Sequence, residues 1–307
     1  MQKHGIQNKR KQDLIFYIIM LAYPVVQFAI FYVGVNVNSL LMAFQEYNVE
    51  QNKYIFLKGS EFFNNFKDVF FELDTKTVFL YAFKNSFIAY FAALIFTTGF
   101  SLVFSYYIFK KFPLHGMMKV VLFTPSIISG IVLISVFVQF VDVVIPSVYK
   151  SVTGNSMQGL IANPDTRFGT VLFYCVWMGF GGSILLYVGA MNNISESIIE
   201  ACKLDGANTL QEVIYIVLPL IYPTFITFIV VGIGGILTNQ MGLYSFFGAT
   251  AREDIQTFGY YFFNETKSAG DTRYPFLATM GIMMTLIVAP VTLAAKWGLE
   301  KIGPKQM

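Results

Sequence analysis

The amino-acid sequence predicts an all-α polytopic membrane protein with six transmembrane helices. The chain of 307 residues is 55% hydrophobic and only 13% charged, whereas about 25% charged residues are usual in soluble domains. The charges are unevenly spread, so that six long stretches carry none. Each stretch reaches the roughly 20 residues that a spanning helix needs. A soluble protein with so many buried helices would need polar cover that this sequence lacks.

The uncharged stretches give the order of the expected spans. Because backbone in lipid must satisfy its own hydrogen bonds, we expect each stretch to form a helix. The stretches are Leu14–Gln45, Asn85–Phe109, Val120–Val141, Phe168–Ser195, Val213–Ala251 and Tyr274–Ala295. We expect one transmembrane domain over residues 1–307, without a soluble domain. The aromatic segment 62–68, in the first outside connection, predicts a short structured element at the interface, whereas residues 142–167, rich in Ser, Asn and Gly, predict a loop.

Basic residues indicate the orientation of the chain. The tight turn between the second and third stretches holds Lys110, Lys111 and Lys119, and basic residues beside spanning helices face the cytoplasm. We therefore expect both termini in the cytoplasm, with residues 1–13 as an N-terminal tail. The first apolar stretch is too long for the apolar core of a signal peptide. We expect it to remain as an uncleaved first helix.

Glycine clusters lie within the fourth and fifth stretches, at Gly179–Gly182 and Gly232–Gly235. Small residues let membrane helices approach closely. Alternatively, the glycines loosen both helices at mid-membrane, as in transporters whose broken helices line a central site. Both interpretations stay open at the level of sequence.

Several classes of function lack the motifs that they require. The sequence contains no GxxxxGK[ST] phosphate-binding loop and no cluster of His, Cys, Asp and Glu that suggests a metal or catalytic site. No carboxylate lies within a predicted span to relay protons. Cys175 and Cys202 are isolated and imply no disulfide framework. We therefore expect no enzymatic activity, no metal site and an energy source outside this chain.

The polar segment 192–218, between the fourth and fifth stretches, predicts two short helices around a glycine. Ser197–Glu200 and Thr209–Glu212 have the spacing of a capping box. Between them, Gly206 can adopt the positive φ that ends a helix. We expect the two helices to meet at nearly a right angle and to project from the membrane, with Pro219 near the entry of the fifth span. A simple surface loop is the alternative.

The same segment resembles the signature loop of permease subunits of binding-protein-dependent ABC importers of the carbohydrate type. The family pattern is Glu-Ala-Ala, three residues, Gly, nine residues and Ile-x-Leu-Pro. It matches this chain at Glu200, Ala201, Gly206, Ile216, Leu218 and Pro219. Asp205-Gly206-Ala207 has the form common in sugar permeases, and Cys202 replaces the second alanine. Residues 43–48 and 63–66 resemble first-loop signatures of the maltose-permease larger-subunit group.

The resemblance implies a type I ABC importer permease fold in a multi-pass protein of a prokaryotic plasma membrane. The segment 192–218 would be a coupling loop whose short helix presents Ala201 and Cys202 to a groove of an ATPase, with Glu200 as polar anchor. The expected coupling residues are Glu200, Ala201, Cys202, Asp205, Gly206, Ala207, Ile216, Leu218 and Pro219.

The resemblance also implies a set of partners. These are a second permease subunit in a heterodimer, two ATPase subunits that use ATP and Mg, an external solute-binding protein and a carbohydrate, expected to be an oligosaccharide. We expect this chain itself to bind no cofactor and no nucleic acid.

Sugar sites combine aromatic faces with amide and hydroxyl groups. The candidates within the predicted spans are Tyr174 and Trp177 in the fourth and Asn239, Gln240 and Tyr244 in the fifth. The two amides face a cavity or lie at the outer end of their helix, and Trp177 also suits a packing role. An ABC permease for a non-sugar solute is the alternative function. A secondary carrier is a further alternative, and it would need no coupling loop.

Overall fold

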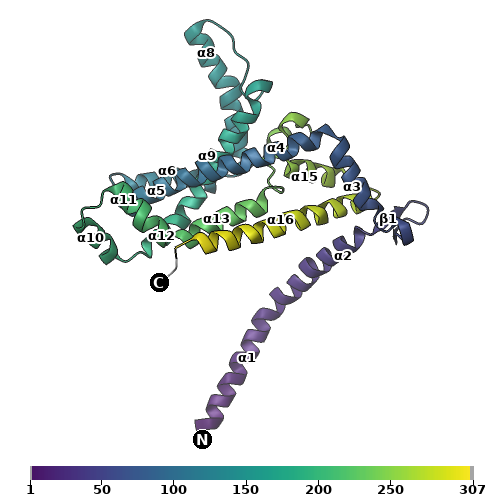
Figure 1. Ribbon diagram of the computed structural model, residues 1–307, viewed down its shortest axis with the longest axis horizontal. Helices are drawn as coiled ribbons and strands as arrows, with labels where there is room; N and C mark the ends of the chain where they lie inside the picture. Colours follow the sequence, from purple (N-terminus) through teal and green to yellow (C-terminus); the bar gives the residue numbers. More distant parts are fainter. Residues whose placement is uncertain (1, 305–307) are drawn as a thin grey trace. The chain divides into compact units, whose positions relative to one another are not determined.

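The computed structural model describes residues 2–304 and divides them into two units, which are described separately here (Figure 1). Within these residues, five helices are long and apolar enough to cross a membrane. A sixth span results when the bent pair Thr209–Leu220 and Tyr222–Gly235 is taken as one. The other five are Gln12–Met42, Thr77–Phe109, Gly130–Thr153, Pro164–Asn192 and Tyr274–Ile302. The predicted class, a polytopic helical membrane protein, is confirmed.

The first unit comprises residues 2–73 together with Ser268–Met283. Helical structure is continuous from Gln2 to Met42. The elements are α1 (Gln2–Gln27), a π-helical segment (Phe28–Gly34), α2 (Val35–Met42), β1 (Gln45–Asn48), β2 (Lys53–Phe56), a 3-10 turn (Gly59–Glu61), most of α3 (Asn64–Thr75) and the beginning of α16 (Tyr274–Ile302).

The connection between the first two spans contains a β-hairpin that the sequence did not predict. Strands β1 and β2 are antiparallel, with Tyr47 opposite Tyr54 and the two rings 5.1 Å apart. The side-chain amide of Asn65, on α3, donates to the carbonyl oxygens of Ala43 and Gln45 at 2.9 and 2.8 Å. These bonds attach α3 to the start of the hairpin. The structured element expected at residues 62–68 is confirmed as α3.

The second unit comprises Asp74–Lys267 and residues 284–304. Its helices are α4 (Thr77–Ala92), α5 (Thr98–Phe109), α6 (His115–Ile127), α7 (Gly130–Gln139), α8 (Ile145–Thr153), α9 (Pro164–Asn192), α10 (Glu196–Leu204), α11 (Thr209–Glu212), α12 (Leu218–Leu220), α13 (Tyr222–Gly235), α14 (Leu243–Phe247), α15 (Phe258–Ser268) and the remainder of α16. Shorter helical segments are the π-helical Ala93–Thr97, Phe140–Val144 and Val213–Val217 and the 3-10 turn Glu253–Ile255.

Helices α5 and α9 lie side by side and run in the same direction (Figure 1). Ser101 donates to the carbonyl oxygen of Phe180 at 3.2 Å, and Ser105 donates to that of Ile184 at 3.1 Å. A step of four residues along one helix thus corresponds to four along the other. A Cβ at Gly179 would lie 3.0 Å from the Thr97 methyl group. Because α9 is unbroken, the loosened fourth helix is not observed, and Gly179 serves close packing against Thr97.

The fifth apolar stretch does not form the single span that we expected. The helix bends by 72° near Ile221 and α13 ends at Gly235, so the residues that follow lie in a loop. A Cβ at Gly232 would come within 2.9 Å of the Tyr90 ring. This glycine cluster therefore serves packing and also lies at the end of the helix.

The third stretch is also divided, and the loop predicted after it is partly helical. Helix α6 ends at Ile127 and α7 begins at Gly130, after which helical structure continues to Thr153. Asp142 does not end this helix, because its carboxylate accepts the backbone N–H of Ile161 at 2.8 Å. The Asp142 carboxylate, which was expected to mark the start of a loop, therefore accepts a hydrogen bond from the segment around Ile161.

The α6–α9 contact provides a stability prediction. A Cβ at Gly181 would lie 2.4 Å from the carbonyl oxygen of Leu122, whereas one at Gly182 would meet nothing within 4 Å. We expect Gly181→Ala to lower the free energy of unfolding by about 1–3 kcal/mol, the usual effect of overpacking. The melting temperature of the detergent-purified protein measures this, with Gly182→Ala as the control. Equal melting temperatures for the two variants would contradict the packing assignment.

Candidate functional site

The polar segment 192–218 folds as the predicted helix, glycine turn and helix. Helix α10 ends at Leu204 and α11 begins at Thr209. Gly206 lies between them with a φ of +76°. The turn is closed by the N–H of Gly206, which donates to Lys203 O at 3.1 Å, and the N–H of Ala207, which donates to Cys202 O at 3.2 Å. The glycine therefore takes the left-handed conformation that was expected of it.

The two predicted capping boxes are wrong in position. The N-cap of α10 is Ser195, whose side chain makes no capping bond, so Ser197 lies inside the first turn. The capping box of α11 is formed by Asn208 and Gln211. Asn208 Oδ1 accepts the Gln211 N–H at 2.9 Å and Gln211 Oε1 accepts the Asn208 N–H at 2.8 Å. Asn208, one residue before Thr209, takes the cap because its side chain reaches the Gln211 amide, while the Glu212 N–H already donates to the Asn208 carbonyl at 2.9 Å.

This difference can be tested in the protein. We expect Asn208→Ala to destabilise the first turn of α11 by about 1 kcal/mol, because it removes one half of the capping box. Hydrogen exchange of the backbone amides of residues 208–213, followed by mass spectrometry, measures the loss of protection. Thr209→Ala should leave that exchange unchanged. A larger loss of amide protection in Thr209→Ala than in Asn208→Ala would show that Thr209 is the N-cap, as predicted from the sequence.

Helix α10 exposes one part of the expected docking surface and buries another. The side chains of Glu200 and Ala201 are exposed, whereas Cys202 is only 7% exposed. The expected presentation of Cys202 to a partner is therefore corrected, since its thiol faces the interior of the loop. Cys202 and Ile199 are the buried residues of this helix.

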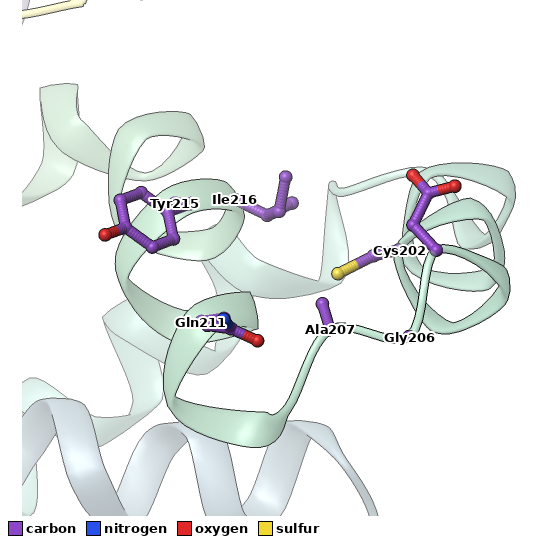
Figure 2. A pocket seen from close by; sticks show the side chains of 7 residues that line it. Cys202, Gly206, Ala207, Gln211, Tyr215 and Ile216 are labelled. Carbon is purple, nitrogen blue, oxygen red and sulfur yellow. The ribbon is translucent and has the colours of Figure 1, made fainter.

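A pocket of about 380 Å³ lies between α10 and the segment that follows the turn (Figure 2). The Cys202 thiol and the Ala207 methyl group point into the space between these segments. The pocket is lined by Cys202, Asp205, Gly206, Ala207, Gln211, Tyr215 and Ile216. Five of the expected coupling residues, Cys202, Asp205, Gly206, Ala207 and Ile216, thus surround one space, although they come from both sides of the turn.

The second half of the loop is packed against the ends of the spans. Tyr106 of α5 and Tyr187 and Met191 of α9 form a buried cluster with Val217 and Ile221. Leu218 packs against this cluster, and Pro219 lies in α12. Pro219 was expected near the entry of the fifth span. It lies just before the 72° bend, and α13 begins after the bend at Tyr222.

An ion pair that the sequence analysis missed joins the loop to the second span. Lys110 Nζ lies 2.8 and 2.9 Å from the two carboxylate oxygens of Glu212. The sequence signal that could have drawn attention to both residues is their position, because each directly flanks an uncharged stretch. Their pairing across the sequence was not evident from spacing.

Of the candidate solute residues, Tyr174 and Trp177 lie together on α9. Their rings are 6.1 Å apart in an edge-to-face arrangement. Phe137 lies 4.9 Å from the Tyr174 ring and 6.4 Å from the Trp177 ring, and Phe246 lies 5.2 Å from Tyr174. Tyr174 is buried, whereas Trp177 is 37% exposed. The cluster therefore leaves part of the Trp177 side chain exposed.

The other candidates, Asn239, Gln240 and Tyr244, lie beyond the end of α13 and not inside a span. Asn239 Oδ1 accepts the Met241 N–H at 2.8 Å, and Thr257 donates to the Asn239 carbonyl at 2.8 Å. The Asn239 side chain thus has a role in the loop. Tyr244, on α14, accepts a hydrogen bond of 2.6 Å from the Lys267 ammonium group.

The hydroxyl group of Tyr260 also holds this loop in place. Tyr260 donates to the Gly248 carbonyl at 2.9 Å and accepts the Ala251 N–H at 3.1 Å. Burial raises the pKa of Tyr260, and the Ala251 N–H opposes that rise. Its hydroxyl therefore stays protonated at neutral pH and continues to donate. Within residues 2–304, no group of three or more His, Cys, Asp and Glu side chains is placed to hold a metal ion.

The long apolar helices define the class of this chain as a multi-pass membrane protein. Residues 104–306 match the family described as "Binding-protein-dependent transport system inner membrane component". The match covers more than half of the chain, and the chain belongs to this family. It is accordingly a membrane permease component that works with a solute-binding protein.

Known proteins similar to this chain include two permeases from Bacillus subtilis (strain 168). The polygalacturonan/rhamnogalacturonan transport system permease protein YteP is 23% identical over 96% of this chain and 94% of its own length. The arabinooligosaccharides transport system permease protein AraP is 26% identical over 41% of each chain.

A solved structure confirms the fold. It is that of a bacterial ABC transporter involved in the import of the acidic polysaccharide alginate. The similar chain in it has a TM-score of 0.76 and 20% identity, and the match covers 97% of this chain and 99% of that one. The expected ABC importer permease fold is therefore confirmed.

Proposed function

We propose that this chain is the permease subunit of an ATP-driven ABC importer that translocates an oligosaccharide delivered by an external solute-binding protein. The observation that carries the proposal is the loop at residues 192–218, in which a short helix with exposed Glu200 and Ala201 is joined by a left-handed glycine to an arm packed on the spans. Such an arrangement suits a docking helix whose movement must reach the membrane. The carbohydrates named for YteP and AraP support the class of solute.

The proposed orientation places this loop and both termini in the cytoplasm. The parallel course of α5 and α9 supports it, because Lys110 then lies at the same end as the loop. The hydroxyl of Tyr222 donates to Leu299 O at 2.9 Å, so the last turns of α16 lie at that end as well. Lysines concentrated at one end of a bundle indicate its cytoplasmic side.

The proposed energy source is a pair of partner ATPases that bind ATP and Mg, since this chain has no phosphate-binding loop. The α10 helix would dock in a groove of one ATPase, with Glu200 as its polar contact. Closure of the two ATPases would bias a pair of permease subunits, expected to be a heterodimer, toward the outward-facing state. A differential affinity of a few kcal/mol is enough to shift such an equilibrium.

The proposed solute pathway runs past the aromatic cluster on α9. Trp177 would contact the C–H face of a sugar ring, with Tyr174 supporting its position. Gln240 and Tyr244 would supply polar contacts from the loop after α13. Asn239 would shape that loop through its bond to Met241.

Purification of the complex through a tag on this chain tests the proposed function. The expected result is co-purification of an ATPase subunit and stimulation of ATP hydrolysis by the binding protein loaded with a carbohydrate. A suitable panel contains oligogalacturonides, arabinooligosaccharides and alginate oligosaccharides, with amino acids and peptides as non-sugar solutes. Stimulation by a non-sugar solute alone would replace the carbohydrate assignment. Uptake by this chain without any ATPase would favour a secondary carrier.

A further inference from the structure

The ion pair between Lys110 and Glu212 connects two parts of the chain that are distant in sequence. Lys110 follows the last residue of α5, and Glu212 is the last residue of α11. Both carboxylate oxygens accept from the ammonium group, and the side chains are 14% and 5% exposed. The ammonium group also lies 5.9 Å from the centroid of the Tyr106 ring. The pair is therefore bidentate and almost completely removed from water.

Stability alone does not account for this ion pair. Removing two charges from water is unfavourable, and replacement of a buried ion pair by apolar residues is often neutral or stabilising. The surroundings here are apolar, since Phe109, Phe112 and Val213 pack against the same cluster. What the charges add over apolar contact is a directional connection between two specific backbone positions.

The position of the pair suits the transfer of movement. Helix α10 buries two residues, Ile199 and Cys202, and a Cβ at Gly206 would meet nothing within 4 Å. Displacement of α10 reaches the rest of the chain by two covalent routes, through residues 193–195 to α9 and through the turn to α11. Glu212 lies on the second route six residues after Gly206, at the point where α11 continues into the arm packed on α5 and α9.

We propose that Lys110 and Glu212 are positioning residues for transport, which transmit the movement of α10 to the second span by holding α11 against the end of α5. This inference rests on the proposed function, because it requires an ATPase that moves α10. Loss of the pair would leave α11 able to shift relative to α5. ATP hydrolysis would then continue without the full movement of the spans.

The test uses the complete complex in proteoliposomes, with the carbohydrate panel described above presented on its binding protein. The variants are Lys110→Met, Glu212→Gln, Lys110→Arg and the exchange Lys110→Glu with Glu212→Lys. Lys111→Met is the matched control, because Lys111 is the adjacent lysine and its side chain is exposed. The measurements are the amount of ATPase subunit retained, the basal ATPase rate, the stimulated rate and the solute imported per ATP hydrolysed.

We expect Lys110→Met and Glu212→Gln to lower the solute imported per ATP about tenfold, within the usual range of coupling between sites. Assembly and basal hydrolysis should stay unchanged, and Lys110→Arg or the charge exchange should restore most of the coupling. Normal coupling in both single variants would overturn the inference, as would loss of the ATPase subunit from them, which would indicate a purely structural role. Absence of an ATPase from the wild-type complex would instead overturn the proposed function, and this inference with it.

Discussion

Replacement of Gly206 with valine is expected to lower oligosaccharide uptake at least tenfold while the chain still enters the membrane and assembles. The φ of Gly206 is +76°, and a non-glycine residue held there costs about 1–3 kcal/mol. A Cβ at this position would meet nothing within 4 Å, so the effect is conformational and not a clash. Relief of the strain changes the turn and therefore the direction of α10. Strain of about 1.4 kcal/mol or more in the docked conformation lowers the population of that conformation at least tenfold.

Two controls separate this effect from general backbone strain. Gly206→Asn should keep most of the uptake, because asparagine tolerates the left-handed region better than other residues. Gly154 has a φ of +72° and equally open surroundings in the connection after α8, so Gly154→Val should retain transport. Uptake is measured in cells, with the membrane content of each variant determined by immunoblot. Wild-type uptake by Gly206→Val, or equal loss in Gly154→Val, would contradict the role of this turn.

The features that the sequence predicted well depend on local chemistry. Four of the six uncharged stretches, the first, second, fourth and sixth, correspond to single spanning helices, because length and apolar composition decide whether a helix crosses a membrane. Gly206 ends a helix because glycine reaches positive φ without steric cost. The exposure of Glu200 and Ala201 was expected from the resemblance of the loop to the family signature. None of these inferences requires knowledge of a distant contact.

The predictions were wrong where contact with a neighbouring segment determines the local structure around a residue. Asp142 was expected to begin a loop, but the backbone of Ile161 donates to its carboxylate and the helix continues. Asn239 was placed inside a span, but α13 ends at Gly235. There the backbone near Thr238 approaches α15 so closely that a Cβ at Gly259 would lie 2.5 Å from it. Such contacts depend on tertiary packing.

The candidate site was predicted in part for the same reason. The motif identified Gly206, Asp205 and Ala207 by their order in the chain, and the structure places them around one pocket. Cys202 was assigned to the outer face of α10 by analogy with alanine, whereas the register of the helix turns it inward. The partner of Glu212 could not be predicted, because Lys110 is 102 residues away in sequence.

We expect Trp177→Ala to raise the KM for oligosaccharide uptake about tenfold with little change in maximal rate. Loss of an aromatic contact is worth about 0.5–1.5 kcal/mol beyond the buried area, and about 1.4 kcal/mol corresponds to a factor of ten. Trp177 is 37% exposed at the edge of a cluster in which Tyr174 is buried. A sugar ring can therefore reach Trp177 but not Tyr174. Uptake of the stimulating oligosaccharide, measured over a range of concentrations, gives the two kinetic constants.

The control for this prediction is the other tryptophan of the chain. Trp297 lies on α16, is more exposed than Trp177 and contacts the Lys301 ammonium group at 4.9 Å from its ring centroid. Trp297→Ala should leave KM unchanged, and Trp177→Phe should restore most of the affinity because it keeps an aromatic face. If Trp177→Ala lowers the melting temperature and leaves KM unchanged, Trp177 is a packing residue. In that case the solute pathway must be sought at Gln240 and Tyr244, beyond the end of α13.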